Sequence, residues 1–275
     1  MKVFSDKSVH FEHLIYQPTI SCLGKCKNCY IQRDFSNKTK ILSLQKIRYD
    51  QFTISIDKEP SFQNITNIDC RRHTWQDKNL CFTIKNPESG ARLIRWLGIS
   101  ILKGVQSISI SDPGKLFILS ELKKILSQHK VELVYNLLCD HTSPTEREQE
   151  LIDAADIVYL TLLKGPLGKE SPLGQQAMDN YFSMKESIPE DKLIEDKCVI
   201  ECKGIVKNKQ SACHAGIHVA TIWPDLSCTG CPYDSLGVHG IDTGDVYQNL
   251  KQVEKIRPIQ SCKVLELVKE NINDV

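Results

Sequence analysis

Residues 131–163, VELVYNLLCDHTSPTEREQELIDAADIVYLTLL, contain the pattern that decides the fold class. Val131 to Leu138 is a nearly continuous apolar run, which is typical of a strand in a parallel sheet. A helix is expected next, because Ser143-Pro144-Thr145-Glu146 matches a capping box with proline at the first helical position. Ile157 to Leu163 then forms a second strand. The order strand–helix–strand predicts a right-handed βαβ unit with two parallel strands.

The same alternation extends from this unit in both directions, over residues 13 to about 190. Expected strands are His13–Ile20 and Val105–Ile110, and expected helices begin at Pro87, Leu116 and Pro172. We therefore expect an α/β fold with a parallel sheet or barrel. Ferredoxin-like and Rossmann arrangements are the alternatives, but no G-x-G-x-x-G follows any of these strands.

Two regions break the alternation. Residues 50–85 contain two β-like runs, Phe52–Ile56 and Leu80–Lys85, without a clear crossover helix between them, which predicts a hairpin-like, β-rich insertion. Residues 191–275 are rich in cysteine, and glycine and proline cluster around residues 213–244. We expect residues 1–190 to form the main domain and residues 191–275 a small cysteine-rich domain.

Composition limits the class of protein. The 275 residues include 35 basic and 34 acidic side chains, a formal net charge of +1, which argues against disorder and against a partner such as duplex DNA. No apolar run approaches the roughly 18 residues that would span a membrane, and residues 1–11 lack the core of a signal peptide. These features predict a cytoplasmic protein without membrane or nucleic-acid partners. The 12 cysteines would stay reduced there, so metal binding or catalysis is their expected use.

Three of these cysteines form a C-x3-C-x2-C triplet directly after the first expected strand: Cys22, Cys26 and Cys29. Three thiolates on one short loop can ligate three irons of a [4Fe–4S] cluster and leave the fourth iron open. A structural zinc site needs a fourth protein ligand, and no cysteine or histidine follows closely. A zinc loop closed by a distant ligand, or three buried thiols, are the alternatives.

The triplet and its position resemble those of the radical S-adenosylmethionine (SAM) enzymes. The resemblance implies a TIM-like partial (β/α)6 barrel in which Cys22, Cys26 and Cys29 hold the cluster and its open iron binds the amino and carboxylate groups of SAM. One electron, from a donor such as flavodoxin or ferredoxin, would split SAM into methionine and a 5′-deoxyadenosyl radical that abstracts a substrate hydrogen. The family often has an aromatic residue before the third cysteine. Here Asn28 stands there and Tyr30 follows, so Tyr30 is the expected adenine contact.

The same resemblance implies two further SAM contacts. Family members carry a Gly-Gly-Glu-Pro-like turn after the next strand, and its backbone receives the SAM amino group. Ser111-Asp112-Pro113-Gly114 resembles a degenerate copy, although both glycines are missing. An ordinary Asp-Pro-Gly turn is the alternative. Asn136 resembles the polar residue that the family's third strand points at SAM.

The second cysteine group resembles the SPASM/twitch extensions of the same enzymes. There a cysteine opens a β-hairpin and the far arm returns another, so that distant thiolates meet. Here Cys213 precedes a β-like run, Ile217–Trp223, and Cys228 and Cys231 follow the turn. The glycine that usually follows Pro-Asp is Leu226, which predicts an altered turn. The resemblance implies one auxiliary cluster with four expected ligands: Cys213, Cys228, Cys231 and Cys262.

Other readings of this group stay open. Cys198 and Cys202 could replace one of the expected ligands, because their spacing puts them on one side of a helix or a strand. Cys228 and Cys231 could instead hold structural zinc with Cys213 and either His214 or Cys262. Free thiols are the third reading. The isolated cysteines are expected to pack as small apolar side chains: Cys70, Cys81 and Cys139.

The sequence thus predicts a radical SAM enzyme with an auxiliary iron–sulfur cluster. Relatives with such extensions often modify peptides by crosslinking or oxidation, so a peptide is the expected substrate. The alternatives are a radical SAM enzyme acting on a small molecule, a glycyl-radical activase, and a zinc-stabilised binding protein. Iron with acid-labile sulfide would favour the enzymes, and zinc alone the binding protein.

Overall fold

The computed structural model describes residues 9–17, 42–44, 47–56, 68–69, 79–84, 98, 104–111, 119–164, 174–207, 215, 218–231, 245–253 and 263–272. The statements below concern these residues.

The described strands form one nine-stranded sheet in the order β11-β10-β1-β3-β5-β6-β7-β8-β9. Every neighbouring pair is parallel except β10 and β11. The expected α/β class and parallel sheet are confirmed, but the described strands form an open sheet and not a closed barrel. The bounds are β1 (Val9–Tyr16), β3 (Ile47–Ile56), β5 (Asn79–Ile84), β6 (Ser107–Ile110), β7 (Glu132–Cys139), β8 (Ile157–Leu162), β9 (Leu193–Glu195), β10 (Val219–Ile222) and β11 (Cys228–Thr229).

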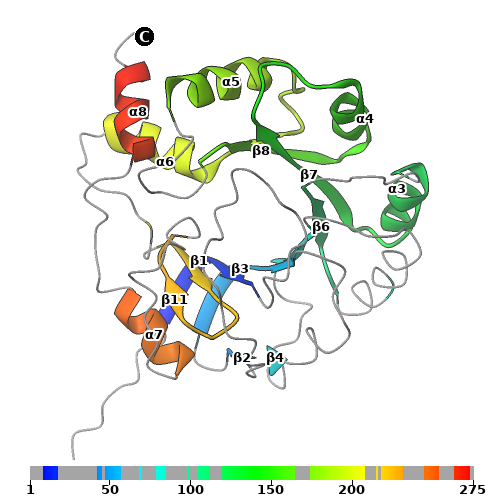
Figure 1. Cartoon of the computed structure of the whole chain (residues 1–275). Coiled ribbons are helices and arrows are strands. Elements are labelled where there is room, and N and C mark those ends of the chain that lie inside the picture. The colour runs from blue at the N-terminus through cyan, green and yellow to red at the C-terminus, as the bar shows by residue number, and fades with distance from the viewer. Residues whose placement is uncertain are drawn as a thin grey trace, which may run out of the picture.

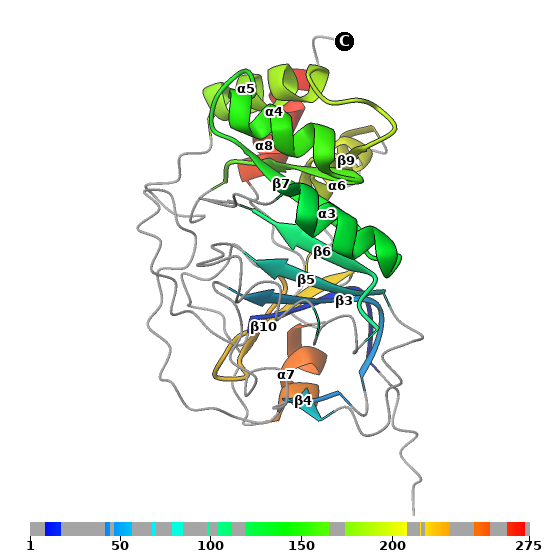
Figure 2. The same ribbon diagram turned by 90° about the vertical axis from the view of Figure 1, so that its right-hand side faces the viewer.

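The strands follow an arc, and three helices lie along its outer side (Figures 1 and 2). These are α3 (Leu119–Gln128), α4 (Glu146–Ala154) and α5 (Gln175–Glu186). Helix α7 (Val246–Val253) packs on β11, β10 and β1, and α6 (Lys197–Lys207) packs on α8 (Lys263–Ile272). A separate short parallel pair joins β2 (Leu42–Ser43) to β4 (Ile68–Asp69).

The core lies between the sheet and these helices. On β7, Leu133 and Leu137 are almost fully buried and alternate with more exposed residues. Leu151 on α4 and Met184 on α5 are buried in the same layer. Because successive side chains of a strand point to opposite faces, this packing leaves the other face of the sheet free for different residues.

The prediction of a hairpin-like insertion at residues 50–85 is wrong. Its two runs are β3 and β5, which pair as parallel neighbours in the middle of the sheet. Parallel strands need a crossover of a dozen or more residues, and residues 57–78 are numerous enough to provide one. The sequence pattern led to the prediction of a hairpin because the segment between the two runs shows no helical periodicity.

The predicted position of the capping box of α4 is also wrong. Thr145 caps the helix and exchanges hydrogen bonds with Glu148, two residues after the expected Ser143–Glu146 box. Both tetrapeptides fit the pattern, since each has a hydroxyl residue three positions before a glutamate. Similarly, β1 begins at Val9 and not at His13, because buried Val9 and Phe11 alternate with exposed neighbours.

The sheet continues across the expected domain boundary at residue 190. Strand β9 extends the sheet beside β8, and β10 lies beside β1 with Leu14 opposite Ala220. The expected hairpin after Cys213 is confirmed as the antiparallel pair β10–β11. Its place beside β1 was not expected, because nothing in the sequence pairs segments about 200 residues apart.

Candidate functional site

One face of the central strands carries small polar side chains where apolar ones are usual. We call Thr53, Ser55, Ser107, Ser109 and Ser111 the hydroxyl face. The first four are 6–8 % exposed, and Ser111 follows β6 directly. Parallel sheets are normally apolar on both faces, so this row of largely buried hydroxyl groups is unusual and makes the face a candidate binding surface. This face lies opposite the one that α3, α4 and α5 cover.

Hydrogen bonds join the strands across this face. Asn136 on β7 donates from Nδ2 to Oγ of Ser111 at 3.3 Å. The sulfur of Cys81 on β5 accepts two hydrogen bonds. Oγ of Ser107 donates at 3.0 Å and Nε2 of Gln51 donates at 3.3 Å. Cys81 therefore belongs to the polar face, whereas Cys139 is fully buried as expected.

A neutral histidine lies at the β1 end of the hydroxyl face. Nε2 of His13 and Oγ1 of Thr53 are 2.8 Å apart in a hydrogen bond. Burial, and then the positive charge of Lys197, lower the pKa of His13 to about 3. The imidazole is uncharged at neutral pH, so it can offer one N–H and one acceptor nitrogen but no charge.

The carboxyl ends of the parallel strands share one edge of the sheet, and in the sequence the cysteine triplet comes after β1, whose carboxyl end lies at that edge. Cys22 comes five residues after Gln17, the last described residue of this segment. The triplet itself, Cys22, Cys26 and Cys29, lies outside the described residues, as does Tyr30. Ligands at such edges are common in open α/β sheets.

The turn expected to bind SAM does not follow the strand next to β1. It comes after β6, which is the fourth strand of the nine-stranded sheet along the chain when β1 is counted as the first. Strands β3 and β5 stand between β1 and β6, so β1 and β6 are three spacings apart, about 14 Å. Asp112, Pro113 and Gly114 lie outside the described residues. Asn136 does share a face with Ser111, but on the fifth of these strands.

In the sequence, a Glu-Pro pair comes shortly after β3, the strand next to β1. Asp57-Lys58-Glu59-Pro60 follows β3 directly and keeps the Glu-Pro pair of the Gly-Gly-Glu-Pro pattern. These four residues lie outside the described ones. Sequence reasoning missed them because residues 50–85 were interpreted as an insertion. The signal was present in the sequence, since Glu59-Pro60 comes three residues after the β-like run that ends at Ile56.

The second cysteine group is only partly described. Cys213 and Cys262 lie outside the described residues. Cys228 begins β11 opposite Ile222, is fully buried, and donates from Sγ to the Leu226 carbonyl at 3.6 Å. Cys231, two residues after β11, is 8 % exposed.

Cys198 and Cys202 lie on α6 and share one side of that helix. Cys202 is almost fully buried and Cys198 is half-buried. Within the described ranges, no group of three or more His, Cys, Asp or Glu side chains is arranged to hold a metal ion.

The hairpin turn keeps the backbone that a glycine would supply. Leu226 has φ of 68°, in the left-handed region, and its N–H donates to the Trp223 carbonyl at 2.9 Å. A side chain there costs roughly 1–2 kcal/mol. Leucine thus adopts here the left-handed backbone that a glycine adopts without strain. Burial of Leu226 and a 2.9 Å bond from Asn249 of α7 to its carbonyl hold it in place.

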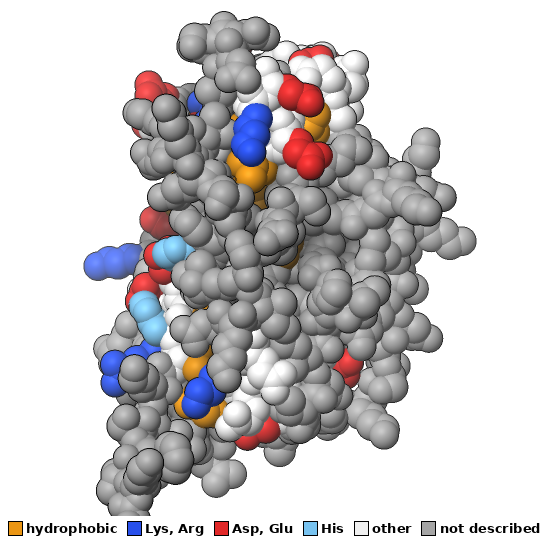
Figure 3. Space-filling view, turned by 90° about the vertical axis from the view of Figure 1, so that its left-hand side faces the viewer, with side chains coloured by type: hydrophobic (Ala, Val, Ile, Leu, Met, Phe, Trp, Pro, Cys, Tyr) orange, Lys and Arg blue, Asp and Glu red, His pale blue; other side chains and the backbone are white. Residues whose placement is uncertain are grey.

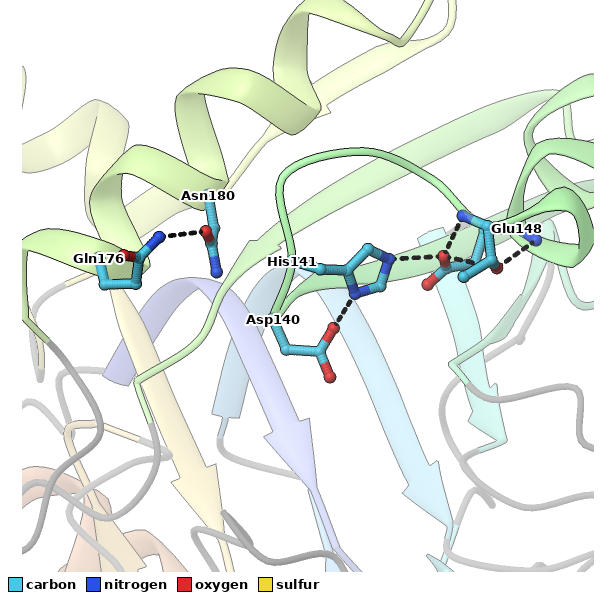
Figure 4. A network of polar contacts seen from close by, with 6 residues as sticks. Asp140, His141, Glu148, Gln176 and Asn180 are labelled. Atoms are coloured by element: carbon cyan, nitrogen blue, oxygen red, sulfur yellow. Dashed lines mark hydrogen bonds and ion pairs between the residues drawn. The ribbon is translucent and has the colours of Figure 1, made fainter.

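A histidine between two carboxylates lies after the carboxyl end of β7 (Figure 4). The ring of His141 bonds to Asp140 through Nδ1 and to Oε2 of Glu148 through Nε2, the latter at 2.7 Å. Burial opposes protonation, but the hydrogen bonds to Glu148 and Asp140 outweigh it and raise the pKa of His141. Glu148 also caps α4 through Thr145, so the network fixes the loop between β7 and α4.

A buried ion pair connects β8 to the start of α6. Lys164 and Asp196 contact each other with side chains only 2 % and 3 % exposed. Asp196 also accepts from the backbone N–H groups of Leu162 at 3.1 Å and Cys198 at 2.8 Å. The carboxylate thus holds the first turn of α6 against the end of β8.

Histidine–carboxylate pairs also occur on the surface. His10 lies 3.0 Å from Asp50, and His218 contacts Glu12, all four at least one-third exposed. Figure 3 shows histidine next to acidic side chains, with basic ones nearby, on this face of the molecule. Exposed pairs of this kind contribute little to stability. No helix in the described part of the chain is long and apolar enough to cross a membrane.

No family model matches the chain, and no curated protein matches it.

Proposed function

We propose that this protein is a radical SAM enzyme in which the cluster loop, Cys22 to Cys29, supplies the cluster ligands and the hydroxyl face of the arc-shaped sheet supplies polar groups for SAM or the substrate. The observation that carries the proposal is the position of the triplet, directly after a strand whose carboxyl end lies at one edge of a parallel sheet. Strands β1, β3, β5, β6, β7 and β8 neighbour one another in chain order, which supports the finer proposal of a partial (β/α)6 barrel.

The residues present fit a cluster and SAM. Three thiolates can ligate three irons, and the hydroxyl face offers buried donors and acceptors for a polar ligand. When bound, the cluster and SAM would together supply a 5′-deoxyadenosyl radical that abstracts a substrate hydrogen. The chain's own residues bind and orient the ligands. Hydroxyl groups on a sheet do this well, because their positions are fixed by the strands.

The β10–β11 hairpin supports a role for the second cysteine group in the same enzyme. Because β10 pairs in parallel with β1, the turn between β10 and β11 lies at the same edge of the sheet as the carboxyl end of β1, the strand before the cysteine triplet. We propose that this group holds an auxiliary cluster and that the substrate is a peptide. The expected ligands are unchanged: Cys213, Cys228, Cys231 and Cys262, with Cys198 or Cys202 as substitutes.

Anaerobic reconstitution tests the proposal. The wild-type protein with iron, sulfide and a strong reductant should convert SAM to 5′-deoxyadenosine, measured by chromatography. Replacing Cys22, Cys26 and Cys29 by alanine should abolish that product, because each thiolate holds one iron. Cys70→Ala is the matched control and should retain activity. Undiminished 5′-deoxyadenosine from the triple variant would refute the proposal.

A further inference from the structure

We propose that the exposed face of β7, β8 and β9 binds an apolar side chain of the peptide substrate. We call Leu138 on β7, Tyr159 on β8 and Ile194 on β9 the apolar patch. That the substrate is a peptide rests on the proposed function, whereas the preference for an apolar group follows from the described residues.

Two large aliphatic side chains of the apolar patch are in contact with solvent. Leu138 is 43 % exposed and Ile194 is 42 % exposed, although leucine and isoleucine are among the residues most often buried. In the part of the chain that the structure describes, one other large apolar side chain is exposed, Ile200 on α6. The exposure is therefore concentrated on this face and is not a general property of the described surface.

Strand register places the three residues of the apolar patch next to one another. Tyr159 is opposite Ile194 in the pair β8–β9, and Leu138 is opposite Thr161 in the pair β7–β8. Thr161 and Tyr159 are two positions apart on β8, so they share a face of the sheet. Leu138 and Tyr159 are therefore diagonal neighbours, and an aromatic side chain reaches that far.

The apolar patch continues the hydroxyl face. Asn136 is opposite Tyr159 and donates to Oγ of Ser111 at 3.3 Å. Leu138 is the residue before the last one of β7, so the patch reaches the carboxyl edge of the sheet. Ligands commonly bind at this edge of open α/β sheets. A substrate whose reacting part lies at the hydroxyl face would have a neighbouring side chain on the apolar patch.

The size and the borders of the patch favour one side chain over a second protein. A stable protein–protein interface takes roughly 800 Å² from each partner, and three partly exposed side chains offer much less. Asn136 and Thr161 border the patch, and their amide and hydroxyl groups can bond to the main chain of a peptide. An apolar surface with polar groups beside it suits an apolar residue within a peptide.

Methyl NMR of the protein without cluster or SAM tests the apolar patch. The probes are N-acetyl-leucinamide and N-acetyl-alaninamide, which share their polar groups and differ in the side chain. The leucine probe should shift the δ1-methyl signal of Ile194, which Ile194→Val identifies. It should bind about tenfold more tightly than the alanine probe, because it buries more apolar surface. The methyl signal of Ile200 is the internal control and should not move.

Variants of Leu138 separate apolar binding from a general surface effect. Leu138→Ser should weaken the leucine probe about tenfold, and Leu138→Met should retain the affinity because it keeps an apolar side chain. Ile200→Ser replaces an equally exposed residue outside the patch and should keep the wild-type affinity.

Three outcomes would refute the apolar patch. The first is the absence of a shift with the leucine probe, or equal affinity for both probes. The second is an affinity that Leu138→Ser leaves unchanged. The third is an Ile194 signal that depends on protein concentration in a protein that elutes as a dimer, since a second copy would then cover this face. None of these measurements needs SAM, so their failure is distinct from failure of the proposed function.

Discussion

Individual buried polar residues carry much of the specificity of this structure. Lys164 and Asp196 are nearly inaccessible to water, and their ion pair fixes where α6 starts. Removing one member of such a pair typically costs about 3–5 kcal/mol, because the other charge is left buried and unpaired. The position of the first turn of α6 at the end of β8 therefore depends on Asp196.

His141 should make stability depend on pH. Its folded pKa is raised above the ordinary 6.5, so its contribution is full below 6.5 and is lost as pH rises through the folded pKa. Burial raises the pKa of Glu148, but bonds from Thr145 and His141 lower it overall, below 4.5. The Glu148 contribution is therefore full above 4.5 and is lost as pH falls through its folded pKa. The His141–Glu148 pair should contribute most to the free energy of unfolding between pH 4.5 and pH 6.5, the ordinary pKa values of the two groups.

Urea unfolding at several pH values measures this effect. His141→Gln should reduce the unfolding free energy near pH 6 by at most about 1 kcal/mol, since the pair is partly exposed, and change it less at pH 8.5. His129→Gln, an exposed histidine at the end of α3, is the control and should keep the wild-type pH profile. An equal loss at both pH values would contradict the role of protonation.

At the scale of elements, strand order decides which turn can reach the cluster loop. The ends of β1 and β3 are one spacing apart, about 5 Å, and those of β1 and β6 about three spacings. A turn that binds SAM next to the cluster should therefore follow β3. This favours Glu59-Pro60 over the turn at Ser111–Gly114.

Paired variants test this choice. Glu59→Ala with Pro60→Ala should weaken S-adenosylhomocysteine binding about tenfold, because the backbone that receives the amino group would lose its fixed shape. Asp112→Ala with Pro113→Ala should change it less than about twofold, with iron content intact in both. The opposite result would restore the turn after β6 as the SAM contact.

At the scale of the whole molecule, the carboxyl end of β1, the strand before the cysteine triplet, and the turn before Cys228 lie at one edge of one sheet. If each group holds a cluster, the reconstituted protein should contain about eight irons. The Cys22/Cys26/Cys29 alanine variant should retain about half, measured with acid-labile sulfide. Alanine at Cys213, Cys228 and Cys231 should leave about four irons and intact SAM cleavage.

Cys139→Ala is the control for this experiment, because Cys139 is as buried as Cys228 and has no proposed metal role. It should keep about eight irons. Stoichiometric zinc in the triplet variant would make the second group a structural zinc site. About four irons and no zinc in the wild type would leave the second group without a metal.

The sequence by itself determined the α/β class, the strands around residues 105–163 and the hairpin after Cys213, because these depend on local periodicity and turn residues. It also supplied the candidate ligands, whose spacing is local. Only the tertiary structure decided that β3 and β5 are central strands and that β10 lies beside β1. Such pairings join residues 26 to 206 positions apart, and their energy comes from packing and hydrogen bonds between strands, which no local pattern encodes.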